Sequence, residues 1–290
     1  MLKLKPSPIQ KVQWQLASDN SISVDIKRDD LLHSVVSGNK WRKLKYLLAD
    51  AKDKQCSKII TMGGNWSNHL HAVAYAGKEL GLKTTGIVRA HAEQALTPTL
   101  KDCELWGMEL RFTTRKEYVE YREQKAWDFF HNNQPNSYWL SEGGFSELAI
   151  KGVMDIADEV DKHYDYIVVA CGSGATLCGL AKAFPKSQII GVAAFSGAEY
   201  LRDELTQHLG SNIDNWEIDT KHHCGGFAKT SKDLEDMIEE LEQLNSFKLD
   251  PVYNGKAFLA LQSRLKSGAF SKGKRVLMLH TGGIQGTRCL

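Results

Sequence analysis

Strand-like and helix-like segments alternate along most of the chain, and this alternation limits the possible fold more than any other feature. Short apolar runs predict strands over 21–27, 58–62, 84–88, 166–170, 188–194 and 275–279. Apolar residues spaced three and four apart predict helices over 67–80, 97–106, 116–131, 147–162, 176–183 and 231–244. We therefore expect an α/β fold of open, mostly parallel twisted sheets flanked by helices.

Two charged, turn-prone stretches, near 50–54 and 132–136, bracket a section with its own strands and helices. We expect this section, residues 53–142, to form a small inserted α/β domain. The large domain would then consist of 1–52 and 143–290. Sites for small molecules often lie between two such lobes. The predicted architecture is therefore two-lobed, with the active site between the lobes.

The composition limits the partners. The 290 residues include 37 basic and 35 acidic side chains, and the net charge of +2 gives no reason to expect nucleic acid or an anionic membrane as a partner. The apolar runs are shorter than the roughly 20 residues that cross a bilayer, and the first residues lack the apolar core of an export signal. The six cysteines form no C-x-x-C pair and are expected to be reduced. We expect a cytoplasmic protein that acts on small molecules.

The first candidate site is Lys40, which a Gly-Asn turn at residues 38–39 places at the start of a predicted helix. The positive end of the helix dipole and the neighbouring Arg42 both disfavour the ammonium form, so we expect a lowered pKa for Lys40. A lysine that loses its proton near neutral pH can form a Schiff base or act as a general base. Taken alone, the segment fits an exposed basic helix turn without chemical function better.

The second candidate site is the glycine turn at residues 61–69, TMGGNWSNH, between a strand and a helix. Its backbone N–H groups suit a carboxylate or phosphate, and Ser67 and Asn68 add polar groups at the helix start. Either residue can instead serve only as the helix N-cap. His69 and His71 have no partners at metal-ligand spacing, so we expect no zinc site.

The third candidate site is the loop at residues 171–179, CGSGATLCG, after an apolar strand. Its N–H groups and the hydroxyls of Ser173 and Thr176 can converge on one phosphate at a helix N-terminus. Leu177 replaces the third glycine of the dinucleotide fingerprint, and the Gly-Lys-Ser/Thr of a Walker loop is missing. The loop therefore predicts a phosphate of neither a dinucleotide nor a triphosphate. A plain turn with glycines for tight packing is the alternative.

Together these segments resemble the family of 1-aminocyclopropane-1-carboxylate deaminases and D-cysteine desulfhydrases, pyridoxal-phosphate enzymes with the fold of the tryptophan-synthase β-subunit. The resemblance runs in order through nearly the whole chain, in blocks at 27–30, 38–44, 63–68, the loop after 169, 250–256 and 280–283. Blocks in the right order are more specific than any one of them.

The resemblance implies roles for the site residues. Lys40 would carry pyridoxal 5'-phosphate as a Schiff base and, with Ser67, be catalytic. The residues implied to bind the cofactor are Lys40, Asn68, Gly172, Ser173, Gly174, Ala175, Thr176, Asn254 and Thr281. Those implied to contact the substrate are Trp66, Ser67, Asn68, His69, Phe227 and Tyr253. A homodimer is implied as well.

Three departures from the family pattern bear on the substrate. Asn254 stands where the deaminases carry Glu, and an amide cannot hold a proton on the pyridine nitrogen as a carboxylate does. Phe227 stands near a tyrosine linked to opening of the cyclopropane ring, and Trp66 replaces a smaller polar residue. A weaker electron sink favours β-elimination. We therefore expect breakdown of D-cysteine or a related β-substituted amino acid to a 2-oxo acid and ammonia.

Other functions stay open at this point. Within the family, the alternative is deamination of 1-aminocyclopropane-1-carboxylate. From another class, the chain could bind pyridoxal phosphate without turnover, because the acidic partner of the ring is missing. A nucleotide-binding regulator is disfavoured by the missing third glycine near residue 177.

Overall fold

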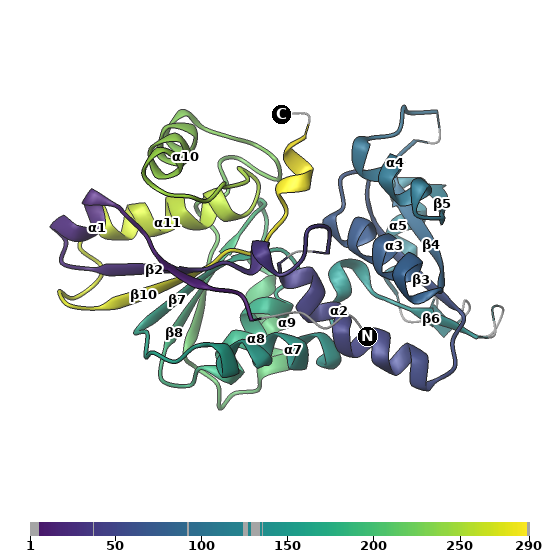
Figure 1. Ribbon diagram of the computed structural model, residues 1–290, viewed down its shortest axis with the longest axis horizontal. Helices are drawn as coiled ribbons and strands as arrows, with labels where there is room; N and C mark the ends of the chain where they lie inside the picture. The colour runs from purple at the N-terminus through teal and green to yellow at the C-terminus, as the bar shows by residue number, and fades with distance from the viewer. Residues whose placement is uncertain are drawn as a thin grey trace.

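The computed structural model describes residues 6–36, 38–91, 93–123, 127–128, 134 and 136–288. Within these residues the strands form a six-stranded sheet, ordered β1-β2-β10-β7-β8-β9, and a four-stranded sheet, ordered β5-β4-β3-β6. Helices cover both sheets, which lie at opposite ends of the long axis of the molecule (Figure 1). The predicted α/β class with two lobes and mostly parallel sheets is confirmed.

The larger sheet is made from both ends of the chain. Its strands are β1 (Ile9–Lys11), β2 (Ser23–Lys27), β7 (Tyr166–Cys171), β8 (Gln188–Ala193), β9 (Trp216–Asp219) and β10 (Arg275–Leu279). Only β1 and β2 pair antiparallel in the described residues. The central strands are buried on both faces, which explains their continuous apolar sequences.

Helices pack on both faces of the larger sheet. One face is covered by α1 (Gln15–Asp19), α10 (Lys232–Leu244) and α11 (Asn254–Lys266). The other face is covered by α7 (Glu147–Met154), α8 (Ala175–Ala183) and α9 (Leu201–Leu209). Each layer contributes its own apolar cluster to the core.

The smaller sheet is parallel throughout its described pairs. Its strands are β3 (Lys58–Gly64), β4 (Lys83–Arg89), β5 (Met108–Thr113) and β6 (Ser137–Trp139). One face packs against α2 (Asn39–Asp53), α3 (Asn68–Leu80) and α4 (Pro98–Leu105), and the other against α5 (Arg115–Glu120). All four strands lie within residues 53–142, although the boundaries of the inserted domain stay a prediction.

Two predicted helices are shorter than the sequence patterns indicate. The helix predicted over 116–131 ends at Glu120 in α5, and residues 124–126 and 129–133 lie outside the described residues. The helix predicted over 147–162 ends at Met154 and tightens into the 3-10 helix η3 (Asp155–Glu159). Acidic residues at the end of this segment oppose the helix dipole, which explains the early end.

Two further predictions concern the chain as a whole. The five cysteines in the described residues, 56, 103, 171, 178 and 224, are free thiols, and Cys289 lies outside them. No helix in the described part of the chain is long and apolar enough to span a membrane.

Candidate active site

The Gly-Asn turn before Lys40 fixes the start of α2. Gly38 has φ +66°, and a Cβ there would lie 1.9 Å from the carbonyl oxygen of Thr281, so only glycine fits. The Asn39 N–H donates to that same carbonyl oxygen at 3.2 Å. The Asn39 side chain donates to Thr176 Oγ1 at 3.1 Å. The turn therefore brings Lys40 to the loop at residues 171–179 and to the segment after β10.

Lys40 is partly buried, and burial lowers the pKa of its amine to about 8. The prediction that Arg42 contributes to this shift is wrong. The Arg42 guanidinium pairs with Asp29, at 2.5 Å from Nε to Oδ2, and with Glu159, at 2.8 Å from Nη1 to Oε1. Its charge is thus matched by two carboxylates, and burial is the cause of the lowered pKa of Lys40.

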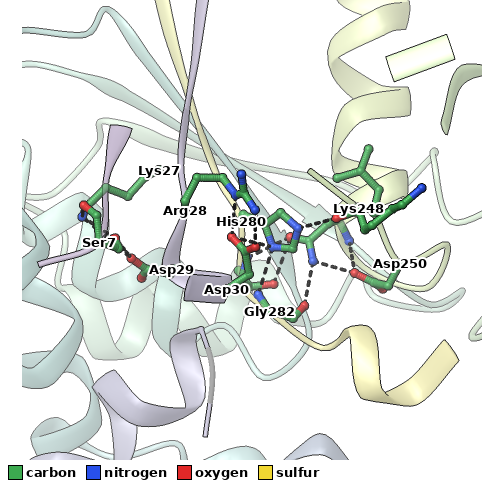
Figure 2. Close-up of polar contacts among 12 residues, drawn as sticks. Ser7, Lys27, Arg28, Asp29, Asp30, Lys248, Asp250, His280 and Gly282 are labelled. Atoms are coloured by element: carbon green, nitrogen blue, oxygen red, sulfur yellow. Dashed lines mark hydrogen bonds and ion pairs between the residues drawn. The ribbon is translucent and has the colours of Figure 1, made fainter. Parts of the chain in front are cut away.

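The ion pairs of Arg42 belong to a buried network below α2. Lys27 Nζ donates to Ser7 Oγ at 2.5 Å, and Ser7 Oγ donates to Asp29 at 2.6 Å (Figure 2). Lys27 Nζ also donates to Glu159 Oε2 at 2.5 Å. Burial opposes the ionised form of Glu159, but hydrogen bonds from Arg42 and Lys27 outweigh it and lower the carboxyl pKa to about 2. The network anchors α2, and with it Lys40, to the larger sheet.

Lys43 lies one helical turn after Lys40 and is also buried, at 3% exposed. Its Nζ lies 3.4 Å from Ser173 Oγ and 3.4 Å from the carbonyl oxygen of Gly143. Burial, and then the charge of Lys40, lower the pKa of Lys43 well below its usual value. Among the described residues no carboxylate forms an ion pair with Lys40 or Lys43. Two uncompensated amines make this region suited to an anion.

The loop at residues 171–179 brings a helix start to Lys43. Gly174 has φ +86°, and a Cβ there would lie 2.3 Å from Leu205 Cδ2. The loop leads into α8, which begins at Ala175 with Thr176 buried behind it. Free N–H groups at a helix start, together with the Ser173 hydroxyl and the Lys43 amine, form a set of donors that fits a phosphate.

The turn after β3 supplies the opposite side of the site. Ser67 is the N-cap of α3, and its Oγ accepts from the Leu70 N–H at 3.2 Å, as the capping alternative predicted. Asn68 Oδ1 accepts a hydrogen bond from Gln285 Nε2 at 2.8 Å. Trp66 is 37% exposed on the preceding loop. The hydrogen of the Ser67 hydroxyl is not needed for capping and can serve a ligand.

His69 is buried beside the two lysines. The Thr61 hydroxyl donates to the Leu140 carbonyl oxygen at 3.0 Å, so its oxygen accepts from His69 Nε2 at 2.8 Å. His69 Nδ1 then carries a lone pair, and it has no partner in the described part of the chain. Burial, and then the charges of Lys40 and Lys43, lower the pKa of His69 well below its usual value. His69 is therefore a neutral acceptor.

Metal ligands are not part of this arrangement. Within the described residues no group of three or more His, Cys, Asp or Glu side chains could hold a metal ion.

Asn254 begins α11 and is enclosed by hydrogen bonds. Its Nδ2 donates to Asp250 Oδ2 at 2.5 Å and to the Gly282 carbonyl oxygen at 2.9 Å. Its Oδ1 accepts from the N–H of Thr281 at 2.9 Å and from Thr281 Oγ1 at 3.2 Å. Nearby, Gly282 N–H donates to His280 Nδ1 at 3.2 Å (Figure 2). Every donor of the Asn254 amide is occupied.

Tyr253 connects Asn254 to the 171–179 loop. A Cβ on Gly172 would lie 3.7 Å from Tyr253 Cε1, so the ring packs against that glycine. Phe227 is 53% exposed and meets the Tyr253 ring edge-on, with 5.9 Å between the ring centroids. Burial, and then Asp250 and Glu142, raise the pKa of the Tyr253 hydroxyl. Tyr253 is therefore a neutral ring at the wall of the site.

Comparisons with known proteins identify the family. A family model described as "Pyridoxal-phosphate dependent enzyme" matches residues 2–282. The chain belongs to this family. It is an enzyme with pyridoxal phosphate as its cofactor, and the predicted resemblance to 1-aminocyclopropane-1-carboxylate deaminases and D-cysteine desulfhydrases is confirmed.

Relatives of this pyridoxal-phosphate enzyme match it over nearly its whole length. A Pyrococcus horikoshii protein named as a candidate 1-aminocyclopropane-1-carboxylate deaminase is 31% identical over 299 residues, covering 97% of this chain and 90% of its own. An Arabidopsis thaliana mitochondrial protein named bifunctional D-cysteine desulfhydrase/1-aminocyclopropane-1-carboxylate deaminase is 29% identical and covers 97% of this chain and 77% of its own. The crystal structure of an ACC deaminase homologue aligns with a TM-score of 0.82 at 30% identity, covering 98% of this chain and 91% of that one.

The residues of the site fit the cofactor of this pyridoxal-phosphate enzyme. Lys40 offers an amine of lowered pKa to an aldehyde, and the buried Lys43 amine beside the start of α8 offers N–H donors to a phosphate. The site residues predicted on α2, α3, α8 and α11 are linked through the contacts of Asn39, His69 and Tyr253.

Three residues of the site were not predicted from the sequence. Lys43 could have been found, because residues three apart on a helix share a face, and Lys43 follows Lys40 at that spacing. Gly143 contacts Lys43 across 100 positions and Gln285 contacts Asn68 across 217. Contacts at such separations leave no signal in a local pattern.

Proposed function

We propose that this chain breaks down D-cysteine or a related β-substituted amino acid by α,β-elimination, with pyridoxal phosphate held on Lys40. The observation that carries the proposal is a pair of lysines, the partly buried Lys40 and the buried Lys43, without a carboxylate partner in the described residues. Buried charges are normally paired, so this pair calls for an anionic ligand. A phosphate ester that also bears an aldehyde satisfies both amines.

The cofactor would be held by groups from both sheets. Lys40 would bond covalently to its aldehyde carbon, while Lys43 and the loop 172–176 would bind its phosphate. The Asn68 amide would donate to its phenolic oxygen, and the Tyr253 ring would border the pyridine ring. Thr281, whose hydroxyl is engaged with Asn254, would lie at the ring nitrogen.

Bound pyridoxal phosphate supplies an electron sink for the bonds at the substrate α-carbon. Lys40 would remove the substrate α-proton, because its pKa of about 8 leaves about a tenth of the amine unprotonated at pH 7, far more than for an ordinary lysine. The Ser67 hydroxyl donates to the substrate carboxylate. The α-carbon electron pair forms the Cα–Cβ double bond as the thiolate leaves with the C–S pair. With one water, the products are a 2-oxo acid, ammonia and a thiol.

The preference for elimination over cyclopropane opening rests on two side chains. The Asn254 amide has both of its N–H groups engaged, on Asp250 and Gly282, so it offers no proton and no negative charge to a ring nitrogen. Phe227, beside Tyr253, has no hydroxyl to donate or accept a proton. Both features disfavour opening of the cyclopropane ring, and they disfavour β-elimination less.

The decisive experiment compares substrates on the purified enzyme. D-cysteine is expected to give pyruvate, sulfide and ammonia, and 1-aminocyclopropane-1-carboxylate is expected to give no 2-oxobutyrate. Lys40→Ala is expected to abolish turnover and the visible absorption band of the cofactor. Lys45→Ala, on the same helix but paired with Asp155, is the matched control and should keep both. Turnover of the cyclopropane substrate alone would favour the deaminase alternative, and bound cofactor with no product from D- and L-amino acids would favour a non-catalytic binding protein.

Two further parts of the proposal concern the setting of the enzyme. We propose a homodimer, which the family resemblance implies and analytical ultracentrifugation would test. We also propose a cytoplasmic location, supported by the free thiols of the five described cysteines, which are typical of reducing compartments. Fractionation of source cells with an antibody to the chain would test it.

A further inference from the structure

The end of the chain crosses from the larger sheet to helices of the smaller one. After β10 it forms the 3-10 helix η4 (Ile284–Thr287), which lies between α11 of the larger sheet and α4 of the smaller one (Figure 1, yellow). Gln285 Nε2 donates to Asn68 Oδ1 at 2.8 Å, and Arg288 Nη2 lies 2.7 Å from Asp102 Oδ2. The segment from Gln285 to Arg288 is therefore bonded to the start of α3 and to α4.

The contact with Gln285 orients the amide of Asn68. Because the Asn68 oxygen accepts from Gln285, the opposite half of the amide, the N–H donor Nδ2, is turned toward other partners. This nitrogen lies beside Gly283, where a Cβ would approach it to 2.8 Å. Gly283, at φ +98°, thus leaves the space that the Asn68 donor occupies.

A second anchor holds the same segment. Asp102, which accepts from Arg288, also lies 2.9 Å from Nε2 of His71, and His71 is one helical turn after Asn68 in α3. Burial opposes ionisation of Asp102, but its bonds to Arg288 and His71 lower the carboxyl pKa. Gln285 is therefore held between β10 and this ion pair.

We propose that Gln285 is a positioning residue that fixes Asn68 with its N–H donor toward the phenolic oxygen of pyridoxal phosphate. The inference rests on the proposed function, because it assumes the cofactor on Lys40. The family model ends at residue 282, so Gln285 lies outside the residues that it matches.

The consequence can be measured on the bound cofactor without turnover. A hydrogen-bond donor beside the phenolic oxygen stabilises that oxygen as an anion. It thereby lowers the pKa of the proton that the oxygen would otherwise share with the lysine-bound nitrogen. If that donor is lost, this pKa rises, and the visible band changes at a higher pH. It also weakens cofactor binding, by about tenfold for one charge-assisted hydrogen bond.

The experiment uses two variants of Gln285 in the full chain. Gln285→Leu removes the donor, and Gln285→Glu has the same shape but can only accept, so it pulls Asn68 Nδ2 away from the cofactor. Gln243→Glu, on the exposed face of α10, carries the same charge change next to Glu239 and should behave like wild type. Thermal unfolding of each variant checks that the fold is kept.

We expect both Gln285 variants to shift the pH titration of the band upward and to weaken cofactor binding about tenfold. Asn68→Ala should cause the same shift, and adding Gln285→Leu to it should change nothing further. If Lys40→Ala abolishes the visible band but neither Gln285 variant shifts its pH titration, the role of Gln285 is overturned and the proposed function stands. A band that survives Lys40→Ala overturns the proposed function and the inference with it.

Discussion

The amide nitrogen of Asn254 lies 2.5 Å from Oδ2 of Asp250, in a buried contact at the start of α11. Asp250 also accepts from the backbone N–H groups of Val252, Tyr253 and Asn254, so its carboxylate holds the turn that leads into this helix. The Asn254 side chain and the turn before α11 thus depend on one carboxylate, and a change at Asn254 acts on both.

Asn254→Asp is expected to destabilise the protein at neutral pH by about 2 kcal/mol or more, since a buried charge would lose its partners. The new carboxylate would face Asp250 and the Gly282 carbonyl oxygen, with no hydrogen to donate. Repulsion raises the pKa of the carboxyl pair in the folded state. Stability should therefore be lost as pH rises through that pKa and recover as pH falls, which urea unfolding at several pH values measures.

Asn254→Ala is the control for this pH dependence. It removes the same hydrogen bonds but adds no charge, so its loss of stability should be independent of pH over the range where the aspartate variant recovers. An aspartate variant that tracks the alanine variant at every pH would mean that the new carboxylate is not in contact with Asp250.

Lys43→Met is expected to weaken binding of pyridoxal phosphate by about 10- to 100-fold, because a charge-assisted hydrogen bond to the phosphate is lost. Binding of pyridoxal, which has no phosphate, should be nearly unchanged. Lys45→Met is the matched control, since Lys45 lies on the same helix but pairs with Asp155. Equal losses for pyridoxal and its phosphate ester would show that Lys43 supports the pocket and not the phosphate.

Local patterns predicted the parts of this fold that depend on local chemistry. The strand over 166–170 and the glycine loop after it follow from an apolar run and a turn, and both are present in β7 and the start of α8. The Ser67 cap follows from the residue type at a helix start, and it is present as well.

Other parts of the site depend on contacts that no local pattern contains. The sequence did not predict α11, because Asp250 and Asn254 are typical of turns. In the structure Asp250 holds the turn before the helix, and Asn254 is the first helical residue. The role of Arg42 was misread, since its partners Asp29 and Glu159 lie 13 and 117 positions away. Burial of Lys40, which sets its pKa, is likewise a property of the packed chain.

Gly38→Ala is expected to destabilise the protein far more than Gly81→Ala. Both glycines have positive φ, but Gly81, at ψ 23°, is left-handed helical, which costs an alanine about 1 kcal/mol. Gly38 has ψ −149°, a backbone conformation that essentially only glycine adopts. A Cβ at residue 81 meets nothing within 4 Å, whereas one at residue 38 would lie 1.9 Å from the Thr281 carbonyl oxygen. We expect an extra loss of about 2 kcal/mol or more for Gly38→Ala. Urea unfolding of both variants measures it, and equal losses would contradict both the glycine-only backbone at residue 38 and its close approach to Thr281.

The rate at which cofactor-free enzyme takes up pyridoxal phosphate is expected to rise with pH and level off above about pH 8, the pKa of Lys40. Only the unprotonated amine attacks an aldehyde, so below this pKa the rate should fall about tenfold for each pH unit by which the pH is lowered. The growth of the visible band after mixing, from about pH 6 to about pH 9.5, gives the rate. A simple lysine derivative in parallel corrects for ionisation of the cofactor itself. If the rate of the enzyme still rises near pH 9.5, in parallel with the rate of the lysine derivative, Lys40 has an ordinary pKa. Burial would then not be the cause of its reactivity.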